Sequence, residues 1–468
     1  RSTRLWRSVL ARLTADEIAR ATGGRIVFGD PGKECAGAAI DSRAIQGGEI
    51  FFALRGTRTD GHRFVSTATG AGAAVVQEDV AAPEGVAVIQ VADTLKALQD
   101  LARHVRSKGV PKKLVGITGS AGKTTTKELL AAMLESRFRI SKTVGNLNNL
   151  IGFPLCLLNV PDGTEWMVAE MGMSTAGELR ELSLMGRPDA AVFTVVRPVH
   201  LEFFASLREI AEAKSELLAG LAAGGPVIAN ADDPEVARIA RRHRGGRVVR
   251  YGIESEEVDV KLRNLAPGPE GIGSRFRLEA DDETAEVSLP LHGLYNAENC
   301  LAAAACSWAL GLSLREIAEA VRDVRPASMR GVVHRGSFTV VDDSYNSNPA
   351  AVAKALEGAA LLPSKRRVAI LGDMRELGPE GPRFHRESGE LAARLGFSPI
   401  LGVGELSREL VAGAAGADAH WVPDAAAAAE WAAREVREGD LVLVKASRGV
   451  GLDAVVRRLL PGSSEEAH

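Results

Sequence analysis

Short apolar runs alternate with helical patterns along most of the chain. Between residues 113 and 233 these runs are "KLVGITG" (113–119), "WMVAEMG" (166–172), "AAVFTVV" (190–196) and "GPVIANADD" (225–233). Each is apolar almost throughout, whereas a strand with one face in water alternates apolar and polar residues. Such runs, separated by helices, predict a parallel sheet that is covered by helices on both faces.

The pattern changes near residues 110, 255 and 330. Residues 1–110 combine short strand-like runs, Gly-rich turns and helical patterns, and end in the polar stretch "RSKGVPKK" (106–113), which is typical of a linker. Residues 255–290 are β-rich and polar, and a new series of apolar runs and Ala-rich helices begins after "RPASMRG" (325–331). We therefore expect an α/β protein with a small α/β domain over 1–110, a central parallel-sheet domain over 111–328 and a Rossmann-like domain over 329–468.

The composition is that of a globular protein, with 46% hydrophobic and 25% charged residues in a chain of 468. A net charge of -3 gives no general attraction to nucleic acid or to an anionic membrane, so neither is expected as a partner. The longest apolar stretches fall short of the roughly 20 residues that cross a bilayer, so no membrane insertion is expected.

The cysteines and the chain start bear on where the protein works. The four cysteines lack C-x-x-C spacing, which favours buried thiols in a reducing cytosol over a zinc site or a disulfide framework. The start, "RSTRLWRSVLARLTADEIARATGG", has no extended apolar region followed by a small-residue cleavage site, so a trimmed N-terminus is expected rather than a signal peptide. We expect a cytoplasmic monomer.

The stretch "GITGSAGKTTTKE" (116–128) joins an apolar strand, a glycine turn and a helical pattern. A helix N-terminus preceded by glycines presents backbone N–H groups and the positive end of the helix dipole to a phosphate. In such a loop Lys123 reaches the outer phosphates and the Thr124 hydroxyl binds magnesium. Full Walker A spacing needs glycine at position 117, where the chain has Ile117, so the loop is a compressed form. A tight turn without a ligand is the alternative, but the order of strand and helix favours a nucleotide site and a central P-loop-type ATPase domain.

Three candidate metal or catalytic side chains follow apolar strands. Glu170 ends the strand-like run "WMVAE", where ligands of α/β sheets gather, so it is placed to bind a metal or is a solvated carboxylate. His200 and Lys214 lie in "RPVHLEFFASLREIAEAKSELL" (197–218). A lone histidine is more often a structural residue and a helix lysine more often a solvated cation, so this stretch decides nothing by itself.

Two later stretches carry polar side chains at positions that suit ligand contacts. Asn296 and Asn299 are three residues apart and share one helix face near its N-terminus, which suits either recognition of a base edge or helix capping. The stretch "VVDDSYNSNPAAV" (340–352) runs from a strand into paired aspartates and a turn, where ligand contacts of an α/β domain are expected.

Taken in order, these stretches resemble the Mur ligase family, the ATP-dependent amide-forming enzymes of peptidoglycan precursor synthesis. The family's nucleotide loop lacks the first Walker glycine in the same way. Within the family the chain is most similar to the branch that adds D-alanyl-D-alanine to UDP-N-acetylmuramoyl-tripeptide, since "SYNSNP" stands where relatives that add diaminopimelate or lysine carry a His-Thr-Pro-Asp type sequence. The resemblance covers residues 13–458 and rests on "DSRAIQGGEIFFALRGTRTDGHRF" (41–64), "TVGNLNNLIGFPL" (143–155), "AEMGMSTAGEL" (169–179), "HLEFFASLREIAEAKSEL" (200–217), "DDSYNSNP" (342–349), "LGDMRELG" (371–378) and "VLVKASRG" (442–449).

The resemblance implies roles in binding ATP and Mg2+. The implied ATP-binding residues are Gly119, Ser120, Ala121, Gly122, Lys123, Thr124, Thr125, Asn296, Asn299, Arg330 and Asp343. The implied metal ligands are Thr124, Glu170, His200 and Lys214, and the implied catalytic residues are Lys123, Glu170, His200 and Lys214. Lys214 matches the lysine that family members carbamylate, which turns a cation into a carboxylate-like ligand. Arg197 departs from the family, which has a small or Asn-like residue there.

The resemblance also implies the substrates, with one domain for each. The N-terminal domain is expected to bind the UDP-N-acetylmuramoyl-tripeptide, the central domain ATP and the C-terminal domain D-alanyl-D-alanine. The implied substrate-binding residues are Ser42, Arg43, Asn146, Asn148, Asn149, Tyr345, Asn346, Asn348, Lys445, Ser447 and Arg448. The implied reaction forms an amide at the tripeptide carboxylate through an acyl-phosphate. The alternatives are a sister ligase that adds one amino acid, a folylpolyglutamate-type ligase, and a P-loop nucleotide-binding protein or kinase with no amide product.

Overall fold

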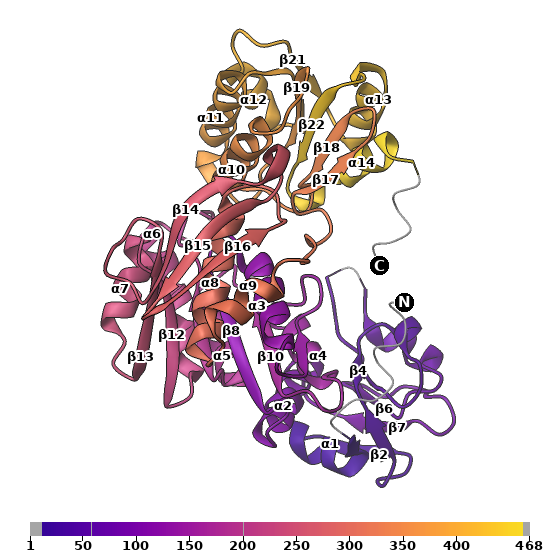
Figure 1. Ribbon diagram of the computed structural model, residues 1–468. Coiled ribbons are helices and arrows are strands. Elements are labelled where there is room, and N and C mark those ends of the chain that lie inside the picture. The colour runs from indigo at the N-terminus through magenta and orange to yellow at the C-terminus, as the bar shows by residue number, and fades with distance from the viewer. Residues whose placement is uncertain (1–11, 58, 200, 462–468) are drawn as a thin grey trace.

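The computed structural model of the protein describes residues 12–57, 59–199 and 201–461. Its strands form three main sheets, which follow one another along the chain (Figure 1). In the part of the chain that the structure describes, no helix combines the length and the apolar character that crossing a membrane requires.

The N-terminal part is a small α/β unit with a five-stranded sheet in the order β2-β7-β6-β5-β4. Only the edge pair β2–β7 is antiparallel. The sheet strands are β2 (Arg25–Phe28), β4 (Ala38–Ala39), β5 (Ile50–Phe52), β6 (Ala73–Val76) and β7 (Ala87–Gln90). The remaining elements are the antiparallel pair β1 (Arg12–Thr14) and β3 (Glu34–Ala36), the helices α1 (Ala15–Thr22) and α2 (Thr94–Ser107), and the 3-10 turns η1 (Ser42–Ala44) and η2 (Gly61–Thr67).

The central part has a nine-stranded sheet in the order β16-β15-β14-β13-β12-β11-β8-β10-β9. The parallel strands are β8 (Lys113–Thr118), β9 (Ile140–Lys142), β10 (Trp166–Glu170), β11 (Ala190–Phe193), β12 (Gly224–Asn230), β13 (Gly246–Gly252) and β14 (Val260–Pro267). The antiparallel β15 (Ser274–Ala280) and β16 (Glu283–Leu289) extend it, which places strands in the polar β-rich region expected near 255–290.

Helices cover this sheet because its central strands are buried on both faces; β11, for example, is buried at all four positions. The helices are α3 (Lys123–Glu135), α4 (Gly152–Leu158), α5 (Glu178–Gly186), α6 (Leu207–Ser215), α7 (Pro234–Arg242), α8 (Tyr295–Ala309) and α9 (Leu314–Ala320), with the 3-10 turns η3 (Glu216–Gly220) and η4 (Pro269–Gly271). The parallel α/β domain expected from the apolar runs is therefore confirmed.

The C-terminal part is a second α/β unit with the strand order β17-β18-β22-β19-β20-β21, in which only β17–β18 is antiparallel. The strands are β17 (Val332–Arg335), β18 (Thr339–Asp342), β19 (Arg366–Gly372), β20 (Phe397–Val403), β21 (Ala419–Val422) and β22 (Asp440–Lys445). The helices are α10 (Pro349–Ala360), α11 (Gly381–Arg394), α12 (Ser407–Gly413), α13 (Ala425–Glu435) and α14 (Asp453–Leu459), with η5 (Gly378–Glu380) and η6 (Arg448–Val450). The expected three-domain α/β architecture is confirmed, while the boundaries at 110 and 328 stay predictions.

The N-terminal and central domains share one apolar core. A single cluster of buried side chains runs from Leu13 to Ala240, and α2 packs against α4 and α5. Arg106, at the end of α2, is only 8% exposed, and its guanidinium donates to the carbonyl oxygens of Gly186 at 2.7 Å and Pro111 at 2.8 Å. The stretch expected to be a linker is thus fastened to the central domain.

The C-terminal domain meets the central domain differently. Ion pairs join the two: Lys354 Nζ lies 2.7 Å from Glu298 Oε2, and Arg335 pairs with Glu270. Ile272 adds an apolar contact to the core of the C-terminal domain. Figure 1 shows this domain, in orange and yellow, stacked on the central one with α10 at the junction.

Candidate active site

The phosphate-type loop lies between β8 and α3 as the sequence predicts. Gly122 precedes α3 in the left-handed conformation (φ 82°), and no side chain caps the first turn, so its N–H groups are available to an anion. A Cβ added at Gly119 (φ 154°) would lie 1.8 Å from Thr194 Oγ1, and one at Gly122 would lie 2.1 Å from Asn299 Oδ1. A side chain at either position would force its neighbour to move and would strain the backbone.

Lys123, Thr124 and Glu170 converge behind this loop. The ammonium of Lys123 donates to the Gly119 carbonyl at 2.8 Å, and burial lowers its pKa, with Glu170 opposing the shift and Arg330 adding to it. The Thr124 hydroxyl donates to Glu170 Oε2 at 2.6 Å, and Asn148 Nδ2 donates to Glu170 Oε1 at 2.8 Å. Glu170 is only 4% exposed, which argues against a solvated strand-end carboxylate. Two oxygen donors so placed suit a hard divalent cation.

Lys214 is buried on α6, with 2% of its surface exposed. Burial lowers its pKa well below the usual value, and the charge of Lys123 adds to this effect. No carboxylate pairs with its ammonium among residues 12–57, 59–199 and 201–461. A solvated surface cation is therefore excluded. The other candidate on this segment, His200, lies outside the described residues.

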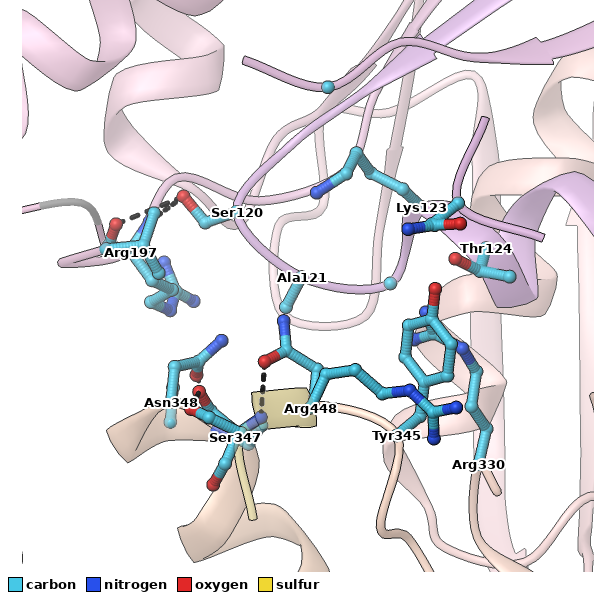
Figure 2. A pocket seen from close by; sticks show the side chains of 18 of the residues that line it. Ser120, Ala121, Lys123, Thr124, Arg197, Arg330, Tyr345, Ser347, Asn348 and Arg448 are labelled. Atoms are coloured by element: carbon cyan, nitrogen blue, oxygen red, sulfur yellow. Dashed lines mark hydrogen bonds between the residues drawn. The ribbon is translucent and has the colours of Figure 1, made fainter. Parts of the chain in front are cut away.

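Lys123, Thr124 and Glu170 line a cavity of about 680 Å³ between the central and C-terminal domains (Figure 2). The cavity gathers most of the residues expected to bind ATP or substrate, from segments far apart in the sequence. They are Ser120, Ala121, Gly122, Lys123, Thr124, Thr125, Asn146, Asn148, Asn149, Glu170, Asn296, Asn299, Arg330, Asp343, Tyr345, Asn346, Asn348, Lys445, Ser447 and Arg448. Of the other candidates, Gly119 belongs to the phosphate loop but does not line the cavity, and neither do Lys214, Ser42 and Arg43.

On the helix side of the cavity, Asn296 and Asn299 occupy the first turns of α8. Asn296 Nδ2 donates to the His292 carbonyl at 2.7 Å, and Asn299 Nδ2 donates to Asn296 Oδ1 at 3.0 Å. Neither caps the helix, since no side chain accepts from its first N–H groups. The capping alternative is therefore wrong, and the amides face the phosphate loop.

On the C-terminal side, an ion pair holds the loop that follows β18. Lys445 is 3% exposed, and its ammonium donates to Asp343 Oδ2 at 2.6 Å and to the Asn346 carbonyl at 3.0 Å. The ring of Tyr345 lies under the guanidinium of Arg330, 4.2 Å from the ring centroid. The hydrogen bonds of Lys445 to Asp343 and Asn346 thus hold the loop after β18 in place at the edge of the cavity.

Ser42 and Arg43 lie on η1 of the N-terminal domain. Ser42 Oγ is 3.2 Å from Thr67 Oγ1, and Arg43 Nη2 donates to Asp41 Oδ2 at 2.7 Å. The hydrogen bonds from Arg43 lower the pKa of the Asp41 carboxyl to about 2. Their role in binding a uridine diphosphate stays a prediction.

The cavity also contains residues that sequence reasoning did not select. Arg197 was noted only as a departure; its Nη1 pairs with the buried Asp233 at 2.6 Å, and its backbone N–H donates to Ser120 Oγ at 2.9 Å. Ser347 and Arg375 stood inside the quoted motifs "DDSYNSNP" and "LGDMRELG", which were the available signal. Lys354 carried no such signal, since its contact with the central domain depends on the domain arrangement.

Comparison with known families and structures agrees with this architecture. Residues 34–106 match the model described as Mur ligase family, catalytic domain, residues 117–307 the Mur ligase middle domain, and residues 329–448 the Mur ligase, glutamate ligase domain.

Individual relatives extend the similarity over nearly the whole chain. The UDP-N-acetylmuramoyl-tripeptide--D-alanyl-D-alanine ligase of Bacillus subtilis (strain 168) is 33% identical over 438 residues, covering 91% of this chain and 93% of the relative. A crystal structure of MurF from Acinetobacter baumannii superposes with a TM-score of 0.87 at 28% identity, covering 97% of this chain and 99% of that one. MurF ligase from Thermotoga maritima in complex with ADP gives 0.78 at 27% identity, covering 90% and 96%. The chain therefore belongs to the Mur ligase family.

Proposed function

We propose that this protein is an ATP-dependent ligase that joins D-alanyl-D-alanine to the terminal carboxylate of UDP-N-acetylmuramoyl-tripeptide, with release of ADP and phosphate. The observation that carries the proposal is the cavity in which the phosphate loop and Glu170 face the polar loops of the C-terminal domain. A phosphate site alone would suit a kinase. Here a second α/β domain lines the same cavity, which leaves room for a second substrate beside the nucleotide. The relatives that are similar over nearly the full length carry this activity in their names.

The chemistry explains why such a cavity needs ATP. A carboxylate is a poor acyl donor, because its leaving group would be oxide. The tripeptide carboxylate attacks the γ-phosphorus of ATP and forms an acyl-phosphate, and ADP leaves. The amino group of D-alanyl-D-alanine then attacks the acyl carbon, phosphate leaves through a tetrahedral intermediate, and the amine proton is released. Lys123 offsets the repulsion between the anionic carboxylate and the triphosphate, the main electrostatic barrier of the first step.

Magnesium fits the donors beside the phosphate loop. The Thr124 hydroxyl and the Glu170 carboxylate supply hard oxygen ligands, and their atoms already lie 2.6 Å apart. We propose Thr124, Glu170, His200 and a modified Lys214 as the residues that hold Mg2+. When bound, the ion neutralises phosphate charge during transfer.

The burial of Lys214 supports its proposed modification. An ammonium beside Mg2+ would repel it, but the lowered pKa of Lys214 favours the neutral amine, whose nitrogen adds to carbon dioxide to give a carbamate and one proton. Replacing Lys214 with Ala is expected to abolish phosphate release, and short carboxylic acids are expected to restore part of it. Unchanged activity in that variant would refute a role at the metal.

The remaining candidate residues take the other substrates. We propose that Ser42 and Arg43 contact the uridine diphosphate and that Asn146 and Asn149 lie near the reacting carboxylate. Asn148 is proposed to orient Glu170, because its Nδ2 already donates to that carboxylate at 2.8 Å. Tyr345, Asn346, Asn348, Lys445, Ser447 and Arg448 belong to the side that receives the dipeptide.

Phosphate release tests the proposal directly. The protein is incubated with ATP and Mg2+, and phosphate is measured with each acceptor alone and with both. Release that needs both UDP-N-acetylmuramoyl-tripeptide and D-alanyl-D-alanine supports the ligase. Release that does not depend on the dipeptide would refute it, and acceptance of a single amino acid or of a folate would indicate one of the alternative ligases.

A further inference from the structure

Lys127 is a buried lysine that the proposed reaction does not use. It is only 1% exposed, and it lies three residues after Thr124 on α3. Residues three apart share one helix face, so Lys127 lies on the same side of α3 as Thr124. An ammonium is buried at a high cost unless it is paired and hydrogen-bonded, so the partners of Lys127 indicate its role.

The ammonium of Lys127 has two partners. It donates to the Thr143 carbonyl at 2.7 Å, and it lies 3.0 Å from Glu128 Oε1. Burial raises the pKa of Glu128, but the charges of Lys127 and Lys142 and their hydrogen bonds outweigh this effect and leave that pKa below its usual value. Glu128 is therefore ionised and balances the charge of Lys127. The hydrogen bond to Thr143 joins α3 to the end of β9.

Thr143 connects Lys127 to Glu170. The pairing of β9 with β10 ends at Lys142 and Val168, and the Thr143 N–H still donates to the Val168 carbonyl at 3.2 Å. In a continued parallel ladder the Thr143 carbonyl would accept from the Glu170 N–H. Here that carbonyl accepts from Lys127, and the Thr143 hydroxyl accepts from the Glu170 N–H at 3.0 Å. Lys127 thus holds the residue that fixes the backbone of Glu170.

These contacts form a closed ring around the two oxygen donors. Glu170 Oε2 accepts from the Thr124 hydroxyl at 2.6 Å, and α3 connects Thr124 to Lys127. A divalent cation that binds both oxygens would replace the hydrogen bond between them. The path through Lys127 and Thr143 would then still fix Glu170 relative to α3. Both residues are only 1% exposed, so water has little access to these bonds.

We propose that Lys127 is a positioning residue for the divalent-cation site, because through Thr143 it holds Glu170 at the distance from Thr124 at which both can bind one ion. This inference rests on the Mg2+ site of the proposed function and assigns the geometry of that site to a residue that does not touch the ion. Mg2+ demands near-ideal octahedral geometry at short distances, whereas Ca2+ accepts a larger and more flexible set of oxygens. A loosened Glu170 should therefore weaken Mg2+ binding more than Ca2+ binding.

The test measures how much each metal strengthens the binding of ATP. Titration calorimetry gives the dissociation constant of ATP in EDTA, in saturating Mg2+ and in saturating Ca2+. The EDTA value divided by the Mg2+ value is the gain from Mg2+, which we expect to be well above one in the unchanged protein. In Lys127→Met this gain should fall by about 10-fold or more, as the loss of an outer partner of a metal ligand implies, and the gain from Ca2+ should fall less. The dissociation constant in EDTA should stay unchanged, because the phosphate loop itself is intact.

Lys261→Met is the matched control. Lys261 is another buried lysine of the central domain, 6% exposed and located on β14. Its ammonium donates to the Ser255 carbonyl at 2.6 Å and pairs with Glu256 at 3.2 Å, and it does not line the cavity. Thermal unfolding of both variants measures the stability that is lost with a buried lysine. Lys261→Met should keep the full gain from Mg2+.

Thr143→Val and Thr143→Ser keep the inference testable if Lys127→Met folds poorly. Valine has nearly the shape of threonine but cannot accept from the Glu170 N–H, so it opens the ring at a different bond. Thr143→Val should therefore lower the gain from Mg2+ as Lys127→Met does. Thr143→Ser keeps the hydroxyl and should retain most of the gain.

The outcomes separate Lys127 from the metal site and from the ligase function. If ATP binds to the unchanged protein equally well in Mg2+ and in EDTA, the proposed metal site itself fails. If the unchanged protein shows the gain and Lys127→Met keeps it, Lys127 serves stability alone and the inference is refuted while the metal site stands. Equal losses for Mg2+ and Ca2+, or weaker binding of ATP in EDTA, would indicate a general disturbance of the phosphate loop and would also overturn it. Dipeptide-dependent phosphate release by the unchanged protein tests the ligase function separately.

Discussion

The fit of Gly122 against Asn299 allows a sharp test of the phosphate loop. In Gly122→Ala the new Cβ would lie 2.1 Å from Asn299 Oδ1, so the amide must move and lose its 3.0 Å hydrogen bond to Asn296 Oδ1. The left-handed backbone at this position (φ 82°) adds a cost of about 1–2 kcal/mol for any residue with a Cβ. Both effects act at the point where the loop meets α3.

We expect the ATP affinity of Gly122→Ala to fall by about 10- to 100-fold. That range corresponds to one or two displaced hydrogen bonds to phosphate, at about 1.5 kcal/mol each. Titration calorimetry with ATP and Mg2+ measures the dissociation constant, and thermal unfolding measures the stability of the same sample.

Gly311→Ala is the control that separates the effect of backbone strain from the effect of the steric clash with Asn299. Gly311 has a similar left-handed backbone (φ 96°), but a Cβ there would meet nothing within 4 Å. This variant should lose similar stability and bind ATP normally. The reasoning would be refuted if Gly122→Ala bound ATP as the unchanged protein does, or if Gly311→Ala lost as much affinity.

Further predictions concern stability. His385 Nε2 accepts from the Met374 N–H at 2.9 Å, and burial lowers the pKa of this histidine. His385→Leu should leave that buried N–H unpaired and reduce the free energy of unfolding, measured in urea, by about 1–3 kcal/mol. Hydrogen bonds from Arg137 lower the pKa of Glu316 to about 2. A lowered carboxyl pKa stabilises the fold above the unfolded value, and this contribution is lost as the pH falls through the folded value. The difference in urea midpoint between the unchanged protein and Arg137→Met should therefore narrow as the pH is lowered from 4.5 toward about 2; a constant difference would contradict the assignment.

The sequence predicts the elements with local signals well. The strand, glycine turn and helix around Lys123 carry their own pattern, and the apolar runs of β8, β10, β11 and β12 predict a buried parallel sheet. The position of Glu170 at the end of a strand is likewise predicted by the apolar run directly before it. These features depend on neighbours within a few residues, so the order of residue types is enough to predict them.

Features that depend on distant pairs could not be predicted from the pattern. Lys445 and Asp343 are 102 residues apart in the chain. Nothing in either segment indicates that the two side chains form an ion pair. The role of Asn148 in holding Glu170 has the same origin, because it depends on two loops that meet only in the folded sheet. Arg375 lies within the quoted motif "LGDMRELG" but was not selected, and only the folded structure places it in the wall of the cavity.

The unequal attachment of the outer domains has a consequence for how they respond to salt. An apolar core continues from the N-terminal into the central domain, whereas ion pairs such as Lys354–Glu298 are among the contacts between the central and C-terminal domains. Added salt weakens exposed ion pairs but leaves an apolar core intact. Ionic strength should therefore weaken the contact between the central and C-terminal domains more than the contact between the N-terminal and central domains.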